Sequence, residues 1–222
     1  MGDAPTTAVL ASAGADSTLA AVLLDPFYDV TLVHGTFGIE STTTPVETAA
    51  EALGVGVETV ALDRAVAGEA VDRMVADGYP REGIQRVHEH ALETVADRGT
   101  VDGRNLSGVA DGTRRDDRAP VVDRSFAQSL EDRHGVDYLR PLAGYGRSAV
   151  DDLVERTLAV ERRPSETLPT GDYEAELRAL MADRYGPEAV ADVFPEHVQS
   201  RVVGRRCRDS DSFSPSEPER HR

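Results

Sequence analysis

The 222-residue chain contains no lysine and no tryptophan, so all 24 of its cationic side chains are arginines. Against 40 Asp and Glu residues, they leave a formal net charge of −16. Such a balance is expected of a protein in concentrated salt, where the Debye length falls to roughly 3 Å and charge repulsion is screened. An acidic protein of ordinary cytosol would explain the charge but not the missing lysine. The composition therefore predicts a cytoplasmic protein of a halophilic archaeon.

Other absences narrow the class of protein further. The single cysteine, Cys207, excludes an intrachain disulfide and any zinc site built on paired cysteines. No apolar run approaches the roughly 20 residues that span a bilayer, and no signal-peptide pattern is present, so we expect no membrane association. The only dense basic run is residues 201–208, and a chain without a basic stripe is not expected to bind nucleic acid non-specifically.

Apolar segments with two different periods alternate along the chain. This alternation predicts an α/β fold with a doubly wound, mostly parallel, Rossmann-like sheet and a helical C-terminal extension. We expect an α/β domain over residues 1–163, the helical extension over 164–207 and a disordered tail over 208–222. The predicted strands are residues 6–11, 28–34, 57–62, 105–110 and 138–142, and the predicted helices are 16–24, 45–53, 65–77, 80–97, 125–134, 148–162 and 173–185.

Between the first strand and the first helix lies a loop of small and polar residues, Ser12-Ala13-Gly14-Ala15-Asp16-Ser17. Small residues let the backbone curl closely around a ligand, and the helix that follows adds the positive end of its dipole. The loop has the ingredients of an anion-binding site, although a simple turn with a helix cap would also use them. It lacks the lysine of G-x-x-x-x-G-K-[ST], which excludes the usual P-loop.

The same six residues resemble the S-G-G-x-D-S signature of the PP-loop ATP pyrophosphatases, also called adenine nucleotide alpha hydrolases. Ala13 stands at the second glycine of that signature, and it fits the loop if its φ is negative. The segment "ADGTRRDDR", residues 110–118, is similar to the second conserved turn of the family, with Arg114 in place of the usual Asn. A third segment, residues 140–156, resembles the strand and helix that follow in several branches.

The resemblance implies cleavage of ATP between its α and β phosphates, transfer of AMP to an acceptor and release of pyrophosphate. It makes residues 1–163 the ATP-binding domain, with ATP and Mg²⁺ as cofactors. Asp16, Arg140 and Arg147 would be catalytic, the two arginines as phosphate clamps. The implied ATP and pyrophosphate contacts are Ala11, Ser12, Ala13, Gly14, Asp16, Ser17, His34, Gly35, Thr36, Asp111, Gly112 and Thr113, and the implied Mg²⁺ ligands are Asp16, Asp116 and Asp117.

Several of these residues also suit ordinary surface or packing positions that carry no function. Asp116 and Asp117 also suit a solvated surface, His34 a packed strand end and Arg147 an ordinary surface position. His88 and His90 lie two residues apart on a predicted helix, so they face different sides and make a poor metal site.

A second motif, residues 144–149, fits G-x-G-x-x-G/A, but a dinucleotide fingerprint needs a βαβ unit around it, and here helix follows helix.

Two functions remain open from the sequence. The first is an ATP-dependent adenylating enzyme acting on a small molecule or tRNA, by a ligase-like or a sulfur-transferase-like step. Ligase-like chemistry needs no cysteine and so fits better a chain whose one thiol is Cys207. The alternative is a non-catalytic module that binds ATP or AMP, and Ala13 and Arg114 are the residues that favour it. The acceptor is not identified by the sequence, and a homodimer is compatible with it.

Overall fold

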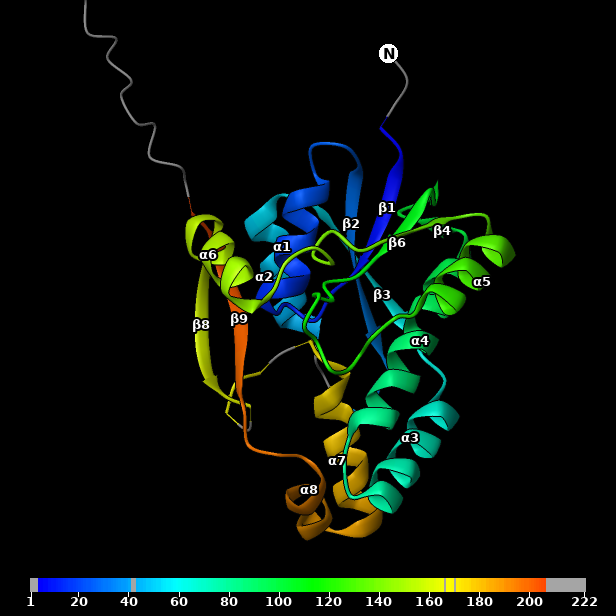
Figure 1. Ribbon diagram of the computed structural model, residues 1–222, viewed down its shortest axis with the longest axis vertical. Helices are drawn as coiled ribbons and strands as arrows, with labels where there is room; N and C mark the ends of the chain where they lie inside the picture. The colour runs from blue at the N-terminus through cyan, green and yellow to red at the C-terminus, as the bar shows by residue number, and fades with distance from the viewer. Residues whose placement is uncertain (1–3, 41–42, 166, 170, 207–222) are drawn as a thin grey trace, which may run out of the picture.

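A computed structural model describes residues 4–40, 43–165, 167–169 and 171–206 (Figure 1). Cys207 and the tail predicted over 208–222 lie outside the described residues. Five parallel strands form the central sheet in the order β3-β2-β1-β6-β7. They are β1 (Thr6–Leu10), β2 (Asp29–Thr36), β3 (Gly56–Ala61), β6 (Gly108–Ala110) and β7 (Asp137–Leu139).

Helices cover both faces of this sheet because its strands are apolar on both sides. Along β1, Ala8 and Leu10 point into one half of the core, and Val9 points into the other. The first half is completed by α3 (Arg64–Asp77), α4 (Arg81–Arg98), α5 (Arg124–His134), α7 (Tyr173–Tyr185) and α8 (Pro187–Val193); the second by α1 (Ala15–Leu24), α2 (Thr43–Leu53) and α6 (Arg147–Thr157). The predicted doubly wound α/β fold is therefore confirmed.

One predicted helix is wrong in its second half. We expected residues 148–162 to be helical, but α6 ends at Thr157 and β8 (Leu158–Pro164) follows directly. β8 pairs antiparallel with β9 (Val198–Arg205), a strand inside the segment expected to be helical. Residues 158–164 are extended because they pair with β9, which lies some 40 residues further along the chain. A prediction from local propensity does not detect a partner at that distance.

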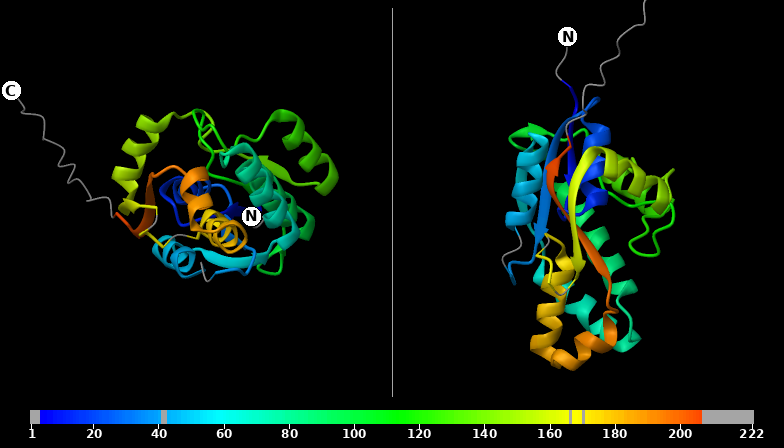
Figure 2. Two further views of the ribbon diagram at one scale, coloured as in Figure 1. Left: turned by 90° about the horizontal axis from the view of Figure 1, so that it is seen from below. Right: turned by 90° about the vertical axis from the view of Figure 1, so that its left-hand side faces the viewer.

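The β8–β9 ribbon is separate from the central sheet and packs against α1 and α2, as the views of Figure 2 show. Its Val202 is fully buried in the same half of the core as those helices. A short hairpin, β4 (Thr100–Val101) with β5 (Arg104–Asn105), splits the strand expected over 105–110. Within the described part of the chain, no helix is long and apolar enough to cross a membrane.

The order of the strands places a topological switch point between β1 and β6. From β1 the chain winds outward through β2 to β3, whereas from β6 it winds the other way to β7. Ligands of open α/β sheets bind in the crevice at the carboxyl ends of the strands at such a point. The two loops that the sequence singled out, residues 12–17 and 111–118, follow these two strands.

Candidate functional site

The loop after β1 holds one residue in a left-handed conformation. Ala13 has a φ of 63°, so the expectation of a negative φ at this position is wrong. Its side chain is fully buried, and its carbonyl oxygen accepts a hydrogen bond of 2.9 Å from the Val202 amide of β9. The surrounding structure therefore imposes a backbone conformation that costs an alanine about 1–2 kcal/mol and a glycine little.

Neutral hydroxyl groups bind the amides of this loop. The Ser12 Oγ accepts from the Gly14 amide at 3.3 Å, and the Ser17 Oγ accepts from the Ser12 amide at 3.4 Å. The Ala15 amide, in the first turn of α1, donates to the Ser200 Oγ of β9 at 3.1 Å. The loop and the helix start are thus satisfied by side chains that an anion can displace without separating an ion pair.

The loop after β6 packs tightly onto the first turn of α1 through Gly112. A Cβ at this glycine would lie 2.5 Å from the Ser17 amide nitrogen and 2.7 Å from the Asp16 carbonyl carbon. Both neighbours are backbone atoms, so neither can rotate away. The close approach of the two loops at the switch point therefore requires glycine at position 112.

Arg114 brings a positive charge to the same place. Its guanidinium lies 3.2 Å from a carboxylate oxygen of Asp16 and donates to the Asp117 carboxylate through Nε at 3.0 Å. The Asp117 side chain also accepts from the Arg114 backbone amide at 2.7 Å. Burial raises the pKa of the Asp16 carboxyl, and the Arg114 charge opposes that rise. The Arg114 Nε also lies 3.8 Å from a carboxylate oxygen of Asp116, so one arginine partly neutralises all three carboxylates expected to bind Mg²⁺.

The third of these carboxylates caps a helix. Asp116 accepts a hydrogen bond of 2.9 Å from the Arg147 backbone amide, at the start of α6. That helix begins at Arg147 with Gly146 as its N-cap, one residue before the predicted start at position 148. The Arg147 side chain is 73% exposed and lies 3.9 Å from Asp151. This backbone contact orients α6 beside the loop after β6.

The 144–149 motif does not have the βαβ unit of a dinucleotide fingerprint. The strand after α6 is β8, which belongs to the separate antiparallel ribbon rather than to the parallel sheet.

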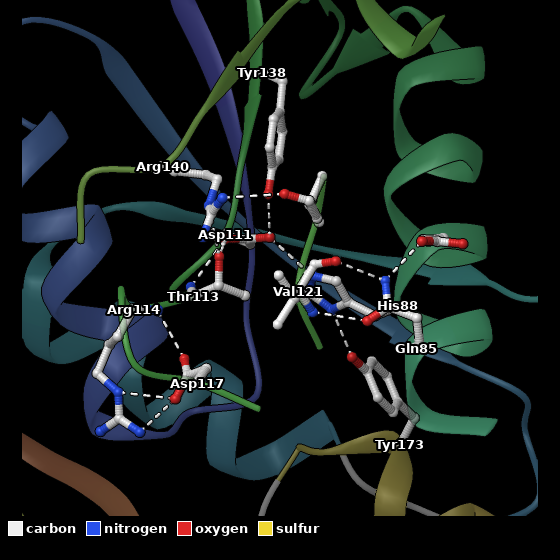
Figure 3. Close-up of polar contacts among 12 residues, drawn as sticks. Gln85, His88, Asp111, Thr113, Arg114, Asp117, Val121, Tyr138, Arg140 and Tyr173 are labelled. Atoms are coloured by element: carbon white, nitrogen blue, oxygen red, sulfur yellow. Dashed lines mark hydrogen bonds and ion pairs between the residues drawn. The ribbon is translucent and has the colours of Figure 1, made fainter. Parts of the chain in front are cut away.

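Behind the Gly112 loop, Asp111 is the centre of a buried hydrogen-bond network (Figure 3). One of its carboxylate oxygens accepts from His88 Nε2 at 2.8 Å and from the Tyr138 hydroxyl at 2.7 Å. The other accepts from the Thr113 amide and hydroxyl, at 2.9 and 2.7 Å. Burial acts to raise the pKa of Asp111, but hydrogen bonds and the His88 interaction outweigh it and lower the pKa to about 2. Arg140 adds a 3.0 Å hydrogen bond to the Thr113 hydroxyl.

His88 and Tyr173 in this network were not predicted as site residues. The Nδ1 of His88 lies 2.7 Å from the Tyr173 hydroxyl, at the start of α7, and burial raises the pKa of Tyr173 well above its ordinary value. His90 faces away, and its ring accepts from the Asp63 amide, so the expectation of opposite faces is confirmed. The available signal in the sequence was a histidine within a predicted helix and an aspartate directly after a predicted strand. Because the two residues are 23 positions apart, the sequence did not show that they are in contact.

The loop after β2 is occupied by a carboxylate of the protein itself. Glu176 of α7 is fully buried and accepts from the Phe37 and Ile39 amides at 2.9 and 2.8 Å, and from the Thr36 hydroxyl at 3.0 Å. His34, earlier on the same strand, is fully buried, and burial lowers its pKa. Of the three residues expected here, Gly35 reaches the cleft described next, whereas Thr36 binds Glu176.

Two clefts open around the switch point. The switch-point cleft, of about 160 Å³, is lined by Leu10, Ala11, Ser12, Asp16, Ser17, Gly35, His88, Asp111, Gly112, Thr113, Asp117, Pro120, Gly171, Asp172 and Tyr173. The ribbon cleft, of about 380 Å³, is lined by Ser12, Gly14, Ala15, Asp16, Ser17, Arg114, Arg147, Asp151, Arg162, Asp172, Glu174, His197, Val198, Gln199 and Ser200. The structure thus brings most of the predicted residues together; Ala13, His34, Thr36, Asp116 and Arg140 line neither cleft.

A resident metal centre is not formed by these acids. Within residues 4–40, 43–165, 167–169 and 171–206, no group of three or more His, Cys, Asp or Glu side chains could hold an ion. Asp16 and Asp117 are instead paired with Arg114, and Asp116 caps α6.

Comparison with known proteins adds relatives from Methanocaldococcus jannaschii. The chain is 38% identical over 197 residues to an uncharacterized protein, MJ0690, covering 88% of this chain and 94% of that protein. A crystal structure from the same organism, described as a predicted subunit of tRNA methyltransferase, has a TM-score of 0.79 and 36% identity, over 91% of this chain and 98% of the other. The family model for a family of unknown function, DUF7411, matches residues 6–204. The chain therefore belongs to the DUF7411 family.

Proposed function

We propose that this protein binds ATP at the switch point and cleaves it between the α and β phosphates, transferring AMP to an acceptor. The observation that carries the proposal is the meeting of the residue 12–17 loop with the residue 111–118 loop, in contact through Gly112, at the carboxyl ends of β1 and β6. That place is where open α/β sheets bind nucleotides, and a helix N-terminus there favours phosphate. The resemblance of both loops to the PP-loop ATP pyrophosphatases supports the same activity.

In this proposal Arg114 supplies the cation that the absent lysine does not. Its guanidinium lies in the ribbon cleft beside the first turn of α1, where Asp16 and Asp117 hold it. A phosphate can replace a carboxylate on a guanidinium because both offer paired oxygens to its planar donors. Arg147 and Arg162 line the same cleft and add to the positive charge, against Asp151 and other acids.

Magnesium would arrive as the counter-ion of ATP. Mg²⁺ bound with nucleotides uses one or two protein carboxylates together with phosphate oxygens and waters, so it needs no three-carboxylate site. Asp16 is the carboxylate in both clefts that also contacts Arg114, and we propose it as the protein ligand. Bound there, Mg²⁺ would stabilise the charge that develops on the pyrophosphate as it leaves.

A titration of MgATP into the full chain in concentrated salt, followed by calorimetry, tests the proposal. We expect Arg114→Gln to weaken ATP binding about tenfold or more, since a charge-assisted hydrogen bond contributes roughly 1.5–3 kcal/mol. Arg156→Gln, on an exposed position of α6 outside both clefts, is the control and leaves the affinity unchanged. Absence of ATP binding to the unmodified protein overturns the proposal.

Formation of AMP separates the proposed enzyme from the second candidate, a module that binds ATP or AMP without turnover. The strained φ of Ala13, where the family signature has glycine, is the observation that favours this second candidate. Chromatography of the nucleotides after incubation with tRNA or a metabolite pool distinguishes the two. Pyrophosphate with an equal amount of AMP, free or attached to the acceptor, supports the enzyme; tight ATP binding with no pyrophosphate supports the module.

The acceptor is proposed to be a small molecule or tRNA. A third hollow of about 640 Å³, between α2, α7 and β9, shares Glu174 and Gln199 with the ribbon cleft, and we assign the acceptor to it. The description of the structural relative as a predicted subunit of tRNA methyltransferase makes tRNA the first acceptor to test. In such a complex the partner subunit would supply the broad basic surface that this acidic chain does not have.

A further inference from the structure

A hydrogen-bonded chain of hydroxyl, imidazole and carboxylate groups runs from α7 to the end of β6. It joins Tyr173 to His88 at 2.7 Å and His88 to Asp111 at 2.8 Å, with Tyr138 on the far side of the same carboxylate (Figure 3). Its members come from α4, α7, β7 and the loop after β6. His88 is 5% exposed and Asp111 is 1% exposed, so bulk water does not compete for the hydrogen bond between them.

The hydrogen bonds of this chain have a fixed direction. Asp111 is ionised, since its pKa is lowered to about 2, and an ionised carboxylate only accepts. The Nε2 of His88 must then carry a hydrogen, so in the neutral form of the ring the lone pair is on Nδ1. In that form the Tyr173 hydroxyl, 2.7 Å away, donates to Nδ1. This arrangement of donor, imidazole and orienting carboxylate is the one that makes a histidine a proton acceptor.

The Tyr173 end of the chain opens where the nucleotide is expected. Tyr173, His88 and Asp111 all line the switch-point cleft, together with Ser12 and Gly112 of the two converging loops. Tyr173 also lines an adjoining hollow with Tyr79 and Pro80, through which a second molecule can approach. A group that attacks a phosphate bound in this cleft would therefore lie close to Tyr173 and His88, which line the cleft.

We infer that His88, oriented by Asp111, takes up through Tyr173 the proton of the group that attacks the α-phosphorus of ATP. This inference rests on the proposed function. A bond forms between the attacking atom and the α-phosphorus while the bond from that phosphorus to the bridging oxygen breaks, and pyrophosphate leaves with the electron pair. The proton of the attacking group passes to the Tyr173 oxygen as the Tyr173 proton passes to Nδ1 of His88. The resulting imidazolium faces the Asp111 carboxylate, which remains ionised.

The inference also restricts the acceptor. A carboxylate acceptor is already deprotonated and has no proton for a base to remove, whereas a hydroxyl, an amide, an amine or water has one. His88 indicates an acceptor of this second, proton-bearing class. The charged and titratable groups that face His88 are Asp111, Asp172 at the N-cap of α7 and Tyr173 in its first turn, with Tyr138 bound to the Asp111 carboxylate.

The test compares two histidines of one helix. With saturating MgATP and water as the attacking group, the rates of AMP and pyrophosphate formation are measured across pH for His88→Gln, Tyr173→Phe and the control His90→Gln. Glutamine at 88 retains a donor toward Asp111 but has no basic nitrogen. We expect His88→Gln to slow AMP formation by about 10²–10⁴-fold, the usual contribution of a general base. It should leave the Kd for ATP unchanged, because the role assigned to His88 is proton transfer.

Tyr173→Phe should slow the same step while retaining the ring that packs at the start of α7, and His90→Gln should change neither rate nor profile. Wild-type turnover that His88→Gln leaves unchanged, or reduces only in proportion to lost ATP affinity or folded protein, overturns this inference and leaves the proposed function standing. A wild-type protein that binds ATP but forms no AMP with water, tRNA or metabolites overturns the catalytic function and this inference together.

Discussion

Two neighbouring loops of this protein solve the same problem in different ways. Residues 12–17 follow β1, and residues 36–40 begin with the last residue of β2, at the carboxyl ends of adjacent parallel strands. Each segment presents backbone amides to a polar group. In the second loop that group is the buried carboxylate of Glu176. In the first loop the groups are the hydroxyls of Ser12, Ser17 and Ser200.

This difference separates a filled anion site from one that can be filled. The residue 36–40 loop already binds a carboxyl group of its own chain, so its amides have no capacity for an anionic ligand. The residue 12–17 loop holds only neutral groups, and a phosphate can replace them at little cost. The fold therefore stabilises one loop permanently and leaves its neighbour available at the switch point.

The largest expected effect on stability comes from removing the Glu176 carboxyl group that the residue 36–40 loop binds. Glu176→Ala leaves the buried Phe37 and Ile39 amides without an acceptor, which should lower the free energy of unfolding by about 3–5 kcal/mol. Glu176→Gln retains one oxygen and should lose roughly half as much. Urea denaturation measures both, with Asp183→Ala at an exposed position of α7 as the control. A loss for Glu176→Ala no greater than that of the control would show that the two loops do not differ in this way.

A pH experiment tests the charge beside the open loop. Asp172 lines both clefts and caps α7 by accepting from the Glu174 amide at 3.0 Å. Burial, and then the nearby Glu174 charge, raise the pKa of Asp172 to about 6. A carboxyl whose pKa is higher in the folded state binds its proton more tightly there, so stability from this group falls as pH rises from about 4 to 6.

Asp172→Asn keeps the capping oxygen and removes the charge, so it should stabilise the protein by about 1–2 kcal/mol at pH 7.5 and by nothing at pH 4. Urea denaturation at the two pH values measures the difference. Asp63→Asn, at the exposed N-cap of α3, is the matched control. Equal effects of Asp172→Asn at both pH values would contradict the raised pKa assigned to the Asp172 carboxyl.

A smaller effect is expected from opening the first loop. Ser200→Ala removes the acceptor of the Ala15 amide, which should lower the free energy of unfolding by about 1 kcal/mol, as for loss of a helix cap. The affinity for ATP should not fall, because a phosphate oxygen can take the place of the hydroxyl. Denaturation and calorimetry measure the two quantities, with Ser129→Ala on the exposed side of α5 as the control. Parallel losses of stability and affinity would mean that Ser200 itself belongs to the binding site.

The smallest effect concerns the strain in that loop. Ala13→Gly should raise the free energy of unfolding by about 0.5–1 kcal/mol, because glycine adopts the φ of 63° without the penalty that alanine meets. Ala11→Gly, at a buried position two residues earlier where φ is not positive, should lower it. Thermal denaturation of the pair decides the sign. A loss in both variants would show that the methyl group of Ala13 contributes more by packing than it costs in strain.

Much of the fold was predictable because its signals are local. The apolar run of residues 6–11, with a capped helix after it, identifies β1 and α1 within one or two residues. The ribbon was not predictable, because residues 158–164 become a strand only through β9 and resemble the end of a charged helix on their own. Strand order is likewise a property of the whole chain, so the sequence did not predict where the switch point lies.

At the candidate site, the sequence located loops but not partners. Both loops follow predicted strands of a parallel sheet, and in the structure they lie together at the edge that such loops share. The pairing of Arg114 with Asp16 was not expected, since it joins residues 98 positions apart, and neither was the carboxylate of Glu176 in the next loop. His88 was judged only against His90, two positions away, whereas its partners come from other elements.

The residue 12–17 loop can form all of its hydrogen bonds only once the last strand of the ribbon is present. Ser200 and Val202 of β9 hydrogen-bond to the residue 12–17 loop and the start of α1, across 185 residues in the case of Ala15 and Ser200. A ribosome releases β1 and α1 well before β9, and domains begin to fold as they emerge. The loop at the switch point therefore stays incomplete until β9 emerges, after all strands of the central sheet have been made.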